Sequence, residues 1–339
     1  MKKINWFIQN RLLRVAASLI VFSLALFTLG WLLTIGDYSV PTTVADDPNL
    51  PVIVANGYRF HGETFGNPDA PPLIVVHGGP GWDYRSLLPL QALADAFHVI
   101  FYDQRGSGLS SRVAAEELSL ESALADLDAI VEKYRRGNRV DLVGHSWGAM
   151  LVAAYLGRKP DKVDHAVLAE PGFFNTELLE RSGLRMGPLW EADYLLFAAI
   201  KWFESLHIDS PDDQAAADYF LAEVASRANP EYYCDGVIPA AGTLRWRAGA
   251  TAMKAVLTSA ANTGEALEFD ITAGLKHYPR PVLLLASECN HFIGVEQQRR
   301  HAKYFNAAEL AIIKGSGHML FAEQPEASLA TVRRYLRNH

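Results

Sequence analysis

The chain has few of the residues on which several protein classes depend. Its 339 residues include only two cysteines, Cys234 and Cys289, too few for a disulfide framework or a cysteine-based zinc site. Two isolated cysteines are more often small buried hydrophobic side chains than a bridge, so a single disulfide is the less favoured interpretation. There is no metal-ligand cluster, no phosphate-binding loop with its lysine and no dinucleotide fingerprint. We therefore predict no metal and no other cofactor.

Positive charge is also scarce. The chain has 31 Lys and Arg against 38 Asp and Glu, a formal net charge of −7. It also lacks a basic stretch with interspersed aromatic residues, so we expect no nucleic-acid partner. Hydrophobic residues make up 50% of the chain, enough for a large buried core, and neither internal repeats nor low-complexity segments interrupt it.

The longest apolar run without a charge, residues 15–35, lies near the N-terminus. As a helix, such a run can cross the ~30 Å hydrocarbon core of a membrane. A cleaved secretory signal is the alternative, but its apolar region is usually only ~7–15 residues and ends in small residues, so we predict an uncleaved single-pass anchor. The positive-inside rule then places the N-terminus in the cytoplasm and the rest outside, in the periplasm or extracellular space. The flanking charges are Lys2, Lys3, Arg11 and Arg14 before the run, and Asp37, Asp46 and Asp47 after it.

The pattern after this run predicts an α/β fold. Asn56-Gly57 separates two short β-prone runs, which indicates a hairpin. Later apolar runs alternate with helical periodicity, which is typical of a mostly parallel sheet with helices on both faces. We predict four parts: a cytoplasmic N-terminus and transmembrane anchor (1–37), a linker (38–51), a core in two segments (52–172 and 279–339) and a helical lid (173–278).

One pentapeptide has the context of a nucleophile elbow. The sequence GHSWG at residues 144–148 follows an apolar strand and opens a helix, which makes Ser146 a candidate nucleophile. The sequence HGGPG at residues 77–81 follows an earlier strand, where glycines allow backbone amides to approach a substrate oxygen. We expect the amides of Gly79 and Trp147 to form an oxyanion hole.

His318 is the candidate general base. It follows the last predicted strand in the sequence GSGH at residues 315–318, late in the chain, as the order nucleophile, acid, histidine requires.

Four blocks in this order resemble the proline iminopeptidase branch of the α/β-hydrolases: HGGPG (77–81), DQRGSG (103–108), GHSWG (144–148) and GSGH (315–318). The resemblance covers roughly residues 52–339. It implies the α/β-hydrolase fold, with Ser146 as nucleophile and His318 as base. It also implies that Asp103 and Arg105 brace the active-site loops.

The acid of the triad departs from the family pattern. Where the resemblance implies an aspartate, this chain has Asn290, and a neutral amide cannot stabilise an imidazolium ion by charge. Two carboxylates are alternatives, Glu170 at the end of an earlier strand and Glu288 near Asn290, with Glu170 the better placed. Glu170 is equally well interpreted as a residue that caps the following turn.

The predicted lid is rich in acidic residues. In the family, lid carboxylates hold the free amino group of the substrate, so by resemblance Glu204, Glu231 or Glu177 is a candidate for that role. A solvated acidic helix face is the more common explanation for any one of them.

These features together predict a serine hydrolase that acts through an acyl-enzyme, an aminopeptidase of proline iminopeptidase type on a peptide substrate. Two alternatives remain. One is a carboxylesterase or lipase-like hydrolase of small or lipid-derived esters, and the other is a non-catalytic binding protein that has kept the fold.

Overall fold

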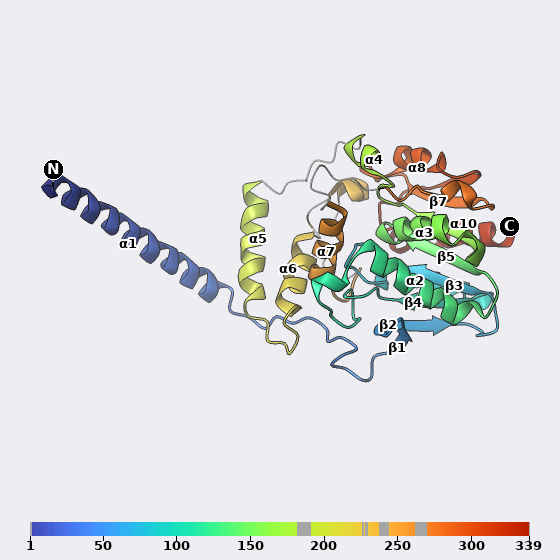
Figure 1. The fold of residues 1–339 in the computed structure, drawn as a ribbon, viewed down its shortest axis with the longest axis horizontal. Helices are drawn as coiled ribbons and strands as arrows, with labels where there is room; N and C mark the ends of the chain where they lie inside the picture. Colours follow the sequence, from blue (N-terminus) through green and yellow to red (C-terminus); the bar gives the residue numbers. More distant parts are fainter. Residues whose placement is uncertain are drawn as a thin grey trace.

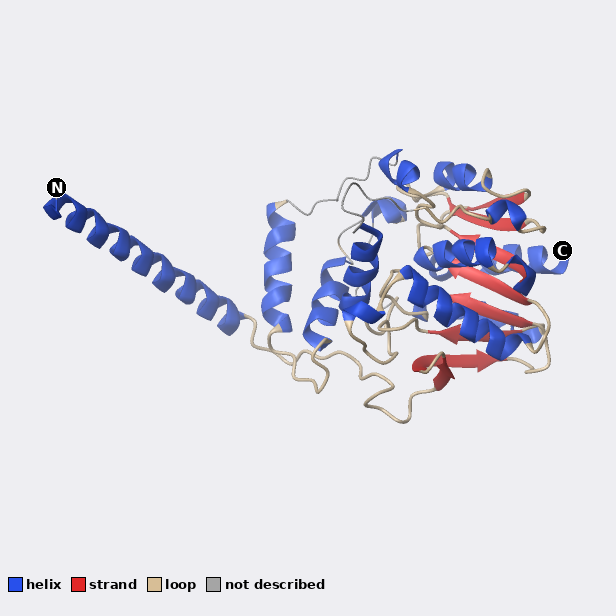
Figure 2. Cartoon of the chain, viewed as in Figure 1, coloured by secondary structure: helices blue, strands red, loops and turns tan. Residues whose placement is uncertain are grey.

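The computed structural model describes residues 2–181, 191–225, 227, 230–236, 244–261 and 270–338. Its centre is an eight-stranded sheet in the order β1-β2-β4-β3-β5-β6-β7-β8 (Figures 1 and 2). The hairpin of β1 and β2 is antiparallel and turns at Asn56 and Gly57, both with positive φ, while β3 to β8 are mutually parallel. The predicted mostly parallel sheet is therefore confirmed. The strands are β1 Val52–Ala55, β2 Tyr58–Phe65, β3 Pro72–Val76, β4 His98–Tyr102, β5 Val140–His145, β6 Val163–Ala169, β7 Val282–Ser287 and β8 Ala308–Ile313.

Both faces of the sheet's central strands are buried, because alternate side chains of these strands enter two different cores. In β3, Ile74 and Val76 join a core with α2 and α3, whereas Leu73 and Val75 join a second core with η1 and α10. Ser119 stands directly before a run of helix-forming residues, which predicts an N-cap, and α2 begins after it, with the Ser119 hydroxyl accepting a hydrogen bond from the amide of Ser122. The covering helices are η1 Arg85–Asp95, α2 Leu120–Arg135, α3 Trp147–Arg158, α8 Val295–Ala302, α9 Leu320–Glu323 and α10 Pro325–Asn338.

Helices fill the described part of the segment between β6 and β7, which we call the insertion (Figure 1). Its only strand-like pairing among the described residues is an isolated bridge between Asn175 and Asp270. The predicted limits of the lid, 173–278, stay a prediction. The helices are α4 Thr176–Arg181, α5 Ala192–Ser205, α6 Ala215–Ala225 and α7 Ala250–Ala261.

A long N-terminal helix, α1 (Lys2–Leu33), projects away from the rest of the chain (Figure 1). Its residues Leu12–Leu33 have a mean hydropathy of 2.2 and no buried share, so this helix is long and apolar enough to cross a membrane. A signal sequence would pass the same test.

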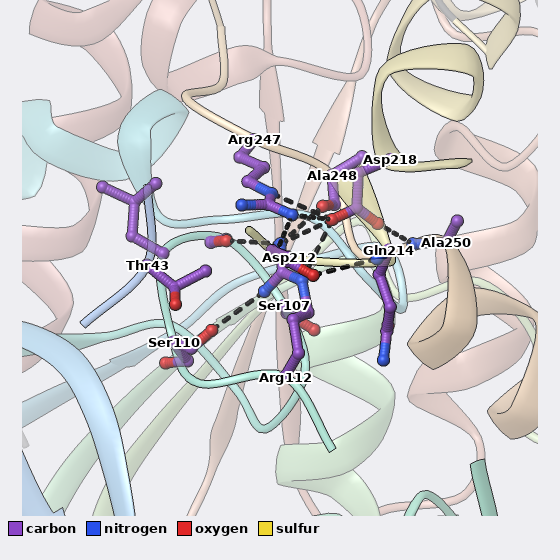
Figure 3. A network of polar contacts seen from close by, with 12 residues as sticks. Thr43, Ser107, Ser110, Arg112, Asp212, Gln214, Asp218, Arg247, Ala248 and Ala250 are labelled. Atoms are coloured by element: carbon purple, nitrogen blue, oxygen red, sulfur yellow. Dashed lines mark hydrogen bonds and ion pairs between the residues drawn. The ribbon is translucent and has the colours of Figure 1, made fainter. Parts of the chain in front are cut away.

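A buried network of charges joins the insertion to the core (Figure 3). Asp218 of α6 is fully buried, and its Oδ2 accepts hydrogen bonds from Arg112 (2.8 Å) and Arg247 (2.9 Å). Arg247 also pairs with Asp212 and donates to the carbonyl of Pro41 in the segment after α1. The two arginines and two aspartates thus balance in charge and connect three separate parts of the chain.

Candidate active site

Ser146 occupies a sharp turn between β5 and α3. It has φ 55° and ψ −120°, a conformation that is rare for a residue with a side chain. A Cβ at Gly144 would lie 2.5 Å from the Gly148 carbonyl, and one at Gly148 would lie 2.1 Å from the Val76 carbonyl. Both flanking positions therefore require glycine, which is the physical reason for the GHSWG pattern.

His318 and Glu170 form a buried pair. Glu170 directly follows β6 and His318 lies in the loop after β8, and His318 Nδ1 is 2.8 Å from Glu170 Oε2. Both residues are buried, with His318 4% exposed and Glu170 fully covered. Because the carboxyl ends of parallel strands meet at one edge of the sheet, this pair and Ser146 share that edge. Of the two alternative carboxylates, it is Glu170 that contacts the histidine.

Hydrogen bonds hold the Glu170 carboxylate in place. Its Oε1 accepts from the amide of Ser287 (2.7 Å) and from the Ser287 hydroxyl, and its Oε2 accepts from Asn290 Nδ2 (2.7 Å). A buried carboxylate is costly without such donors, and these donors also fix its orientation toward His318.

Asn290 supports the carboxylate rather than replacing it. Its Oδ1 accepts from the amides of Phe292 and Ile293, which directs Nδ2 toward Glu170 and leaves Nδ2 3.5 Å from His318 Nδ1. An amide nitrogen in this position cannot accept the Nδ1 proton. Glu288 is exposed and accepts from the amide of Gly315, so it does not contact His318.

The HGGPG segment lies beside Ser146. A Cβ at Gly78 would be 3.0 Å from the Cβ of Ser146, and Gly79 has φ 123°, which favours glycine. The amide of Trp147 follows Ser146 at the first position of α3, where the helix dipole favours developing negative charge. The structure thus brings the two predicted oxyanion segments together at Ser146.

Gln104 braces both segments, a role that we did not predict. Its Oε1 accepts from Trp147 Nε1 (3.0 Å) and its Nε2 donates to the carbonyl of His77 (2.7 Å). The neighbouring Asp103 is fully buried and accepts from the amide of Tyr84 and from the imidazole of His61. The DQRGSG block marks this loop in the sequence, but the block does not show which of its side chains contacts both oxyanion segments.

His145 positions the His318 backbone. Burial, and to a smaller extent the charge of His318, lowers the pKa of His145 to about 3, so its imidazole stays neutral at physiological pH. Its Nε2 donates to the carbonyl of His318 at 2.8 Å. The residue before the serine therefore ties the nucleophile turn to the histidine loop.

A disulfide joins Cys234 of the insertion to Cys289 in the loop after β7, so the interpretation of both cysteines as unpaired was wrong. The insertion also folds back over the loop after β8, where the Tyr232 carbonyl accepts from the amide of His318 (2.6 Å) and the Tyr232 ring stacks on the imidazole, with 4.5 Å between centroids. The spacing of the two cysteines in the sequence does not reveal that the insertion returns to these loops. The predicted position outside the cytoplasm is the one signal that favoured a disulfide.

The acidic residues of the insertion differ in their surroundings. Glu204 is buried in the insertion and its Oε2 accepts from Lys201 (2.8 Å) and Tyr219 (2.6 Å). The carbonyl of Glu231 accepts from the amide of His291, and its exposed side chain lies next to Tyr232 in sequence. Glu177 is exposed on α4. Of these three residues, Glu231 lies in the segment that contacts the His318 loop, through its neighbour Tyr232.

One group of described residues, Asp141, Asp164 and His165, offers three metal-ligand atoms within 4.8 Å of one another. Ion pairs already occupy it: Asp141 Oδ1 is 2.7 Å from His165 Nδ1, and Asp164 pairs with Arg280. Asp141 is the second residue of β5, at the opposite end of the strand from Ser146. The group has no part in the candidate site.

We expect the disulfide to stabilise the fold measurably. It closes a segment of 55 residues, and such bridges typically contribute about 2–4 kcal/mol to the free energy of unfolding. A thiol reductant should therefore lower the thermal midpoint of the wild type. It should leave the Cys234→Ser/Cys289→Ser variant unchanged, and an equal shift in both proteins would argue against the bridge.

Comparison with known proteins identifies the family. The family model for the alpha/beta hydrolase fold matches residues 71–325, and the chain belongs to this family. A proline iminopeptidase of Heyndrickxia coagulans is 28% identical over 296 residues, which cover 79% of this chain and 91% of that protein.

Solved structures agree on the fold. The proline iminopeptidase of Mycobacterium smegmatis superimposes with a TM-score of 0.59 at 20% identity, covering 86% of this chain and 98% of that one. A thermophilic esterase from Thermogutta terrifontis gives a TM-score of 0.60 at 19% identity, with coverages of 85% and 97%. The chain is thus a hydrolase with proline iminopeptidases among its relatives.

Proposed function

We propose that the chain is a serine hydrolase of proline iminopeptidase type that releases an N-terminal residue through an acyl-enzyme. The observation that carries this proposal is the buried Glu170–His318 pair at 2.8 Å, at the same sheet edge as the Ser146 turn. With Nδ1 bonded to Glu170, the His318 imidazole has Nε2 available for the serine hydroxyl.

In the proposed reaction, Ser146 Oγ attacks the substrate carbonyl while His318 Nε2 takes its proton. The Gly79 and Trp147 amides stabilise the oxyanion. When the intermediate collapses, the carbon–nitrogen bond breaks, and the leaving amine takes the proton from His318. A water molecule, deprotonated by the same histidine, then attacks the ester carbonyl; the bond to Ser146 Oγ breaks, His318 returns the proton to that oxygen, and the acid product leaves.

The substrate amino group needs a carboxylate near the oxyanion site. Glu231 is the better candidate, because the carbonyl of Glu231 accepts from the amide of His291, next to Asn290, and the neighbouring Tyr232 carbonyl accepts from the amide of His318. Glu204 is engaged by Lys201 and Tyr219. An esterase without an amine site is the second candidate function. The replacement of the family's aspartate by Asn290 is the feature that would favour a non-catalytic protein, and the contact of Glu170 with His318 weakens that case.

We propose further that α1 is an uncleaved anchor, with the N-terminus in the cytoplasm and the hydrolase outside. The apolar segment Leu12–Leu33 supports the anchor, and the Cys234–Cys289 disulfide supports an oxidising compartment.

Turnover of proline naphthylamide and of a short-chain nitrophenyl ester by the full chain in detergent tests the substrate class. Ser146→Ala, shown to be folded by circular dichroism, is the control. We expect serine-dependent amide cleavage with the higher kcat/KM. Equal or faster turnover of the ester would favour the esterase.

A further inference from the structure

The helix α5 exposes its apolar side. Leu195, Leu196, Ile200 and Trp202 are 41–64% exposed, and with the exposed alanines Ala192 and Ala199 they follow helical spacing along the outer side of α5. Among the described residues outside the α1 region, only three other large hydrophobic side chains are comparably exposed, and they are scattered: Val54, Leu257 and Ile312. A contiguous stripe of this kind indicates a contact surface.

Two of the three charged side chains of α5 point the other way; the third, Asp193 in the first turn, is exposed at the edge of the stripe. Glu204 is buried, and Lys201 is only partly exposed; its Nζ contacts Glu204 at 2.8 Å and Glu223 of α6 at 3.4 Å. A surface helix in water normally turns its charges outward and its apolar residues inward. From Leu195 to Glu204 that order is reversed, which is favourable when the outer side of the helix contacts hydrocarbon rather than water.

Contacts with α1 fix the position of α5. Phe27 lies 6.2 Å from the Trp202 ring and 5.5 Å from the Phe203 ring, and Gly30 leaves room for Phe203. Phe27 is six residues before the end of the apolar segment at Leu33, which is about 9 Å at 1.5 Å per residue. If α1 crosses the membrane, these contacts therefore bring the C-terminal part of α5 to the depth of the outer bilayer interface. Figure 1 shows α5 as the part of the insertion that faces α1.

We infer that α5 is a second membrane-binding element, whose apolar side is embedded in the outer interface of the bilayer. This inference depends on the proposed anchor and commits to lipid as the occupant, because the stripe continues the lipid-facing surface of α1. The insertion is then held against the membrane beside the catalytic edge. Trp202 is an interfacial residue, as tryptophan commonly is.

Site-directed fluorescence in vesicles tests the inference with the full chain. Both native cysteines are in the disulfide, so a single introduced cysteine can carry an environment-sensitive probe. We would label Leu196→Cys on α5, Leu24→Cys in α1 and Leu257→Cys on α7, and reconstitute each in phosphatidylcholine vesicles with and without nitroxide-labelled lipid. Leu196 and Leu257 are similarly exposed, at 64% and 54%, so the α7 position is the matched control.

We expect the Leu196 probe to emit at shorter wavelength and to be quenched by nitroxide lipid several-fold more than the Leu257 probe. Equal, water-like signals at 196 and 257 with strong quenching at 24 would overturn the inference but leave the anchor. No quenching at either 24 or 196 would overturn both. A shielded but unquenched probe at 196, with cross-links between copies through the thiol of the Leu196→Cys variant, would also overturn it in favour of a protein contact. None of these readouts depends on activity, so failure of the proposed hydrolysis would be a separate result.

Discussion

Glu170→Gln is expected to lower kcat about 10⁴-fold while leaving the fold intact. The carboxylate lies 2.8 Å from His318 Nδ1, where its charge would stabilise the imidazolium formed during each step. A neutral amide in that position loses this charge and can present an N–H group to Nδ1, which favours the wrong tautomer. The same exchange of acid for amide in a serine protease triad has an effect of this size.

A second substitution tests whether the loss of kcat is due to the missing carboxylate charge beside His318. Asn290 Nδ2 is 3.5 Å from His318 Nδ1, so Asn290→Asp in the Glu170→Gln background brings a carboxylate near the histidine. We expect it to restore at least part of the lost kcat. In the wild type, Asn290→Asp would set two carboxylates side by side, raise the pKa of one of them and shift the acid limb of the pH profile upward. A Glu170→Gln enzyme within tenfold of wild type would rule out Glu170 as the acid.

Asp218→Ala is expected to lower the free energy of unfolding by about 3–5 kcal/mol. The substitution leaves Arg112 and Arg247 without their shared carboxylate in a buried site, and breaking a buried ion pair by removing one partner typically has a cost of this size. Urea unfolding of the full chain in detergent would measure it. The exposed pair Arg136–Asp69 is the control, since Asp69→Ala should cost only a small fraction of this. Similar effects at both positions would contradict the structural role of the network.

The strands and most of the core helices were predictable because their signals are local. Apolar runs followed by glycine turns predicted the parallel strands, and the capping residue Ser119 marked the start of α2. The placement of Ser146 and His318 at one edge of the sheet was also predictable, because each belongs to a short glycine-containing block that follows a strand.

The sequence did not decide which carboxylate contacts His318. Strands β6 and β7 are neighbours in the sheet, with Ala169 opposite Leu285, so residues just after either strand can reach the same histidine. The choice depends on side-chain directions in two loops. Glu170 has φ 46°, a conformation that no sequence pattern announces, and this turn directs its carboxylate toward Ser287 and Asn290.

The insertion was the least predictable part. The family resemblance made Glu204 one of three candidates for the amine-binding residue, but α5 turns that side chain inward to Lys201 and Tyr219. The pairing of Cys234 with Cys289 depends on the insertion returning to the loop after β7, a tertiary contact across 55 residues. Local periodicity carries no information about such contacts.

Labelling of Ser146 by a fluorophosphonate probe tests the central claim most directly. The full chain would be treated in detergent and the modified peptide identified by mass spectrometry, beside folded Ser146→Ala and Glu170→Gln. We predict labelling at Ser146 in the wild type, slower labelling in Glu170→Gln and none at position 146 in Ser146→Ala. A folded wild-type protein that is not labelled at Ser146 would contradict the proposed serine hydrolase.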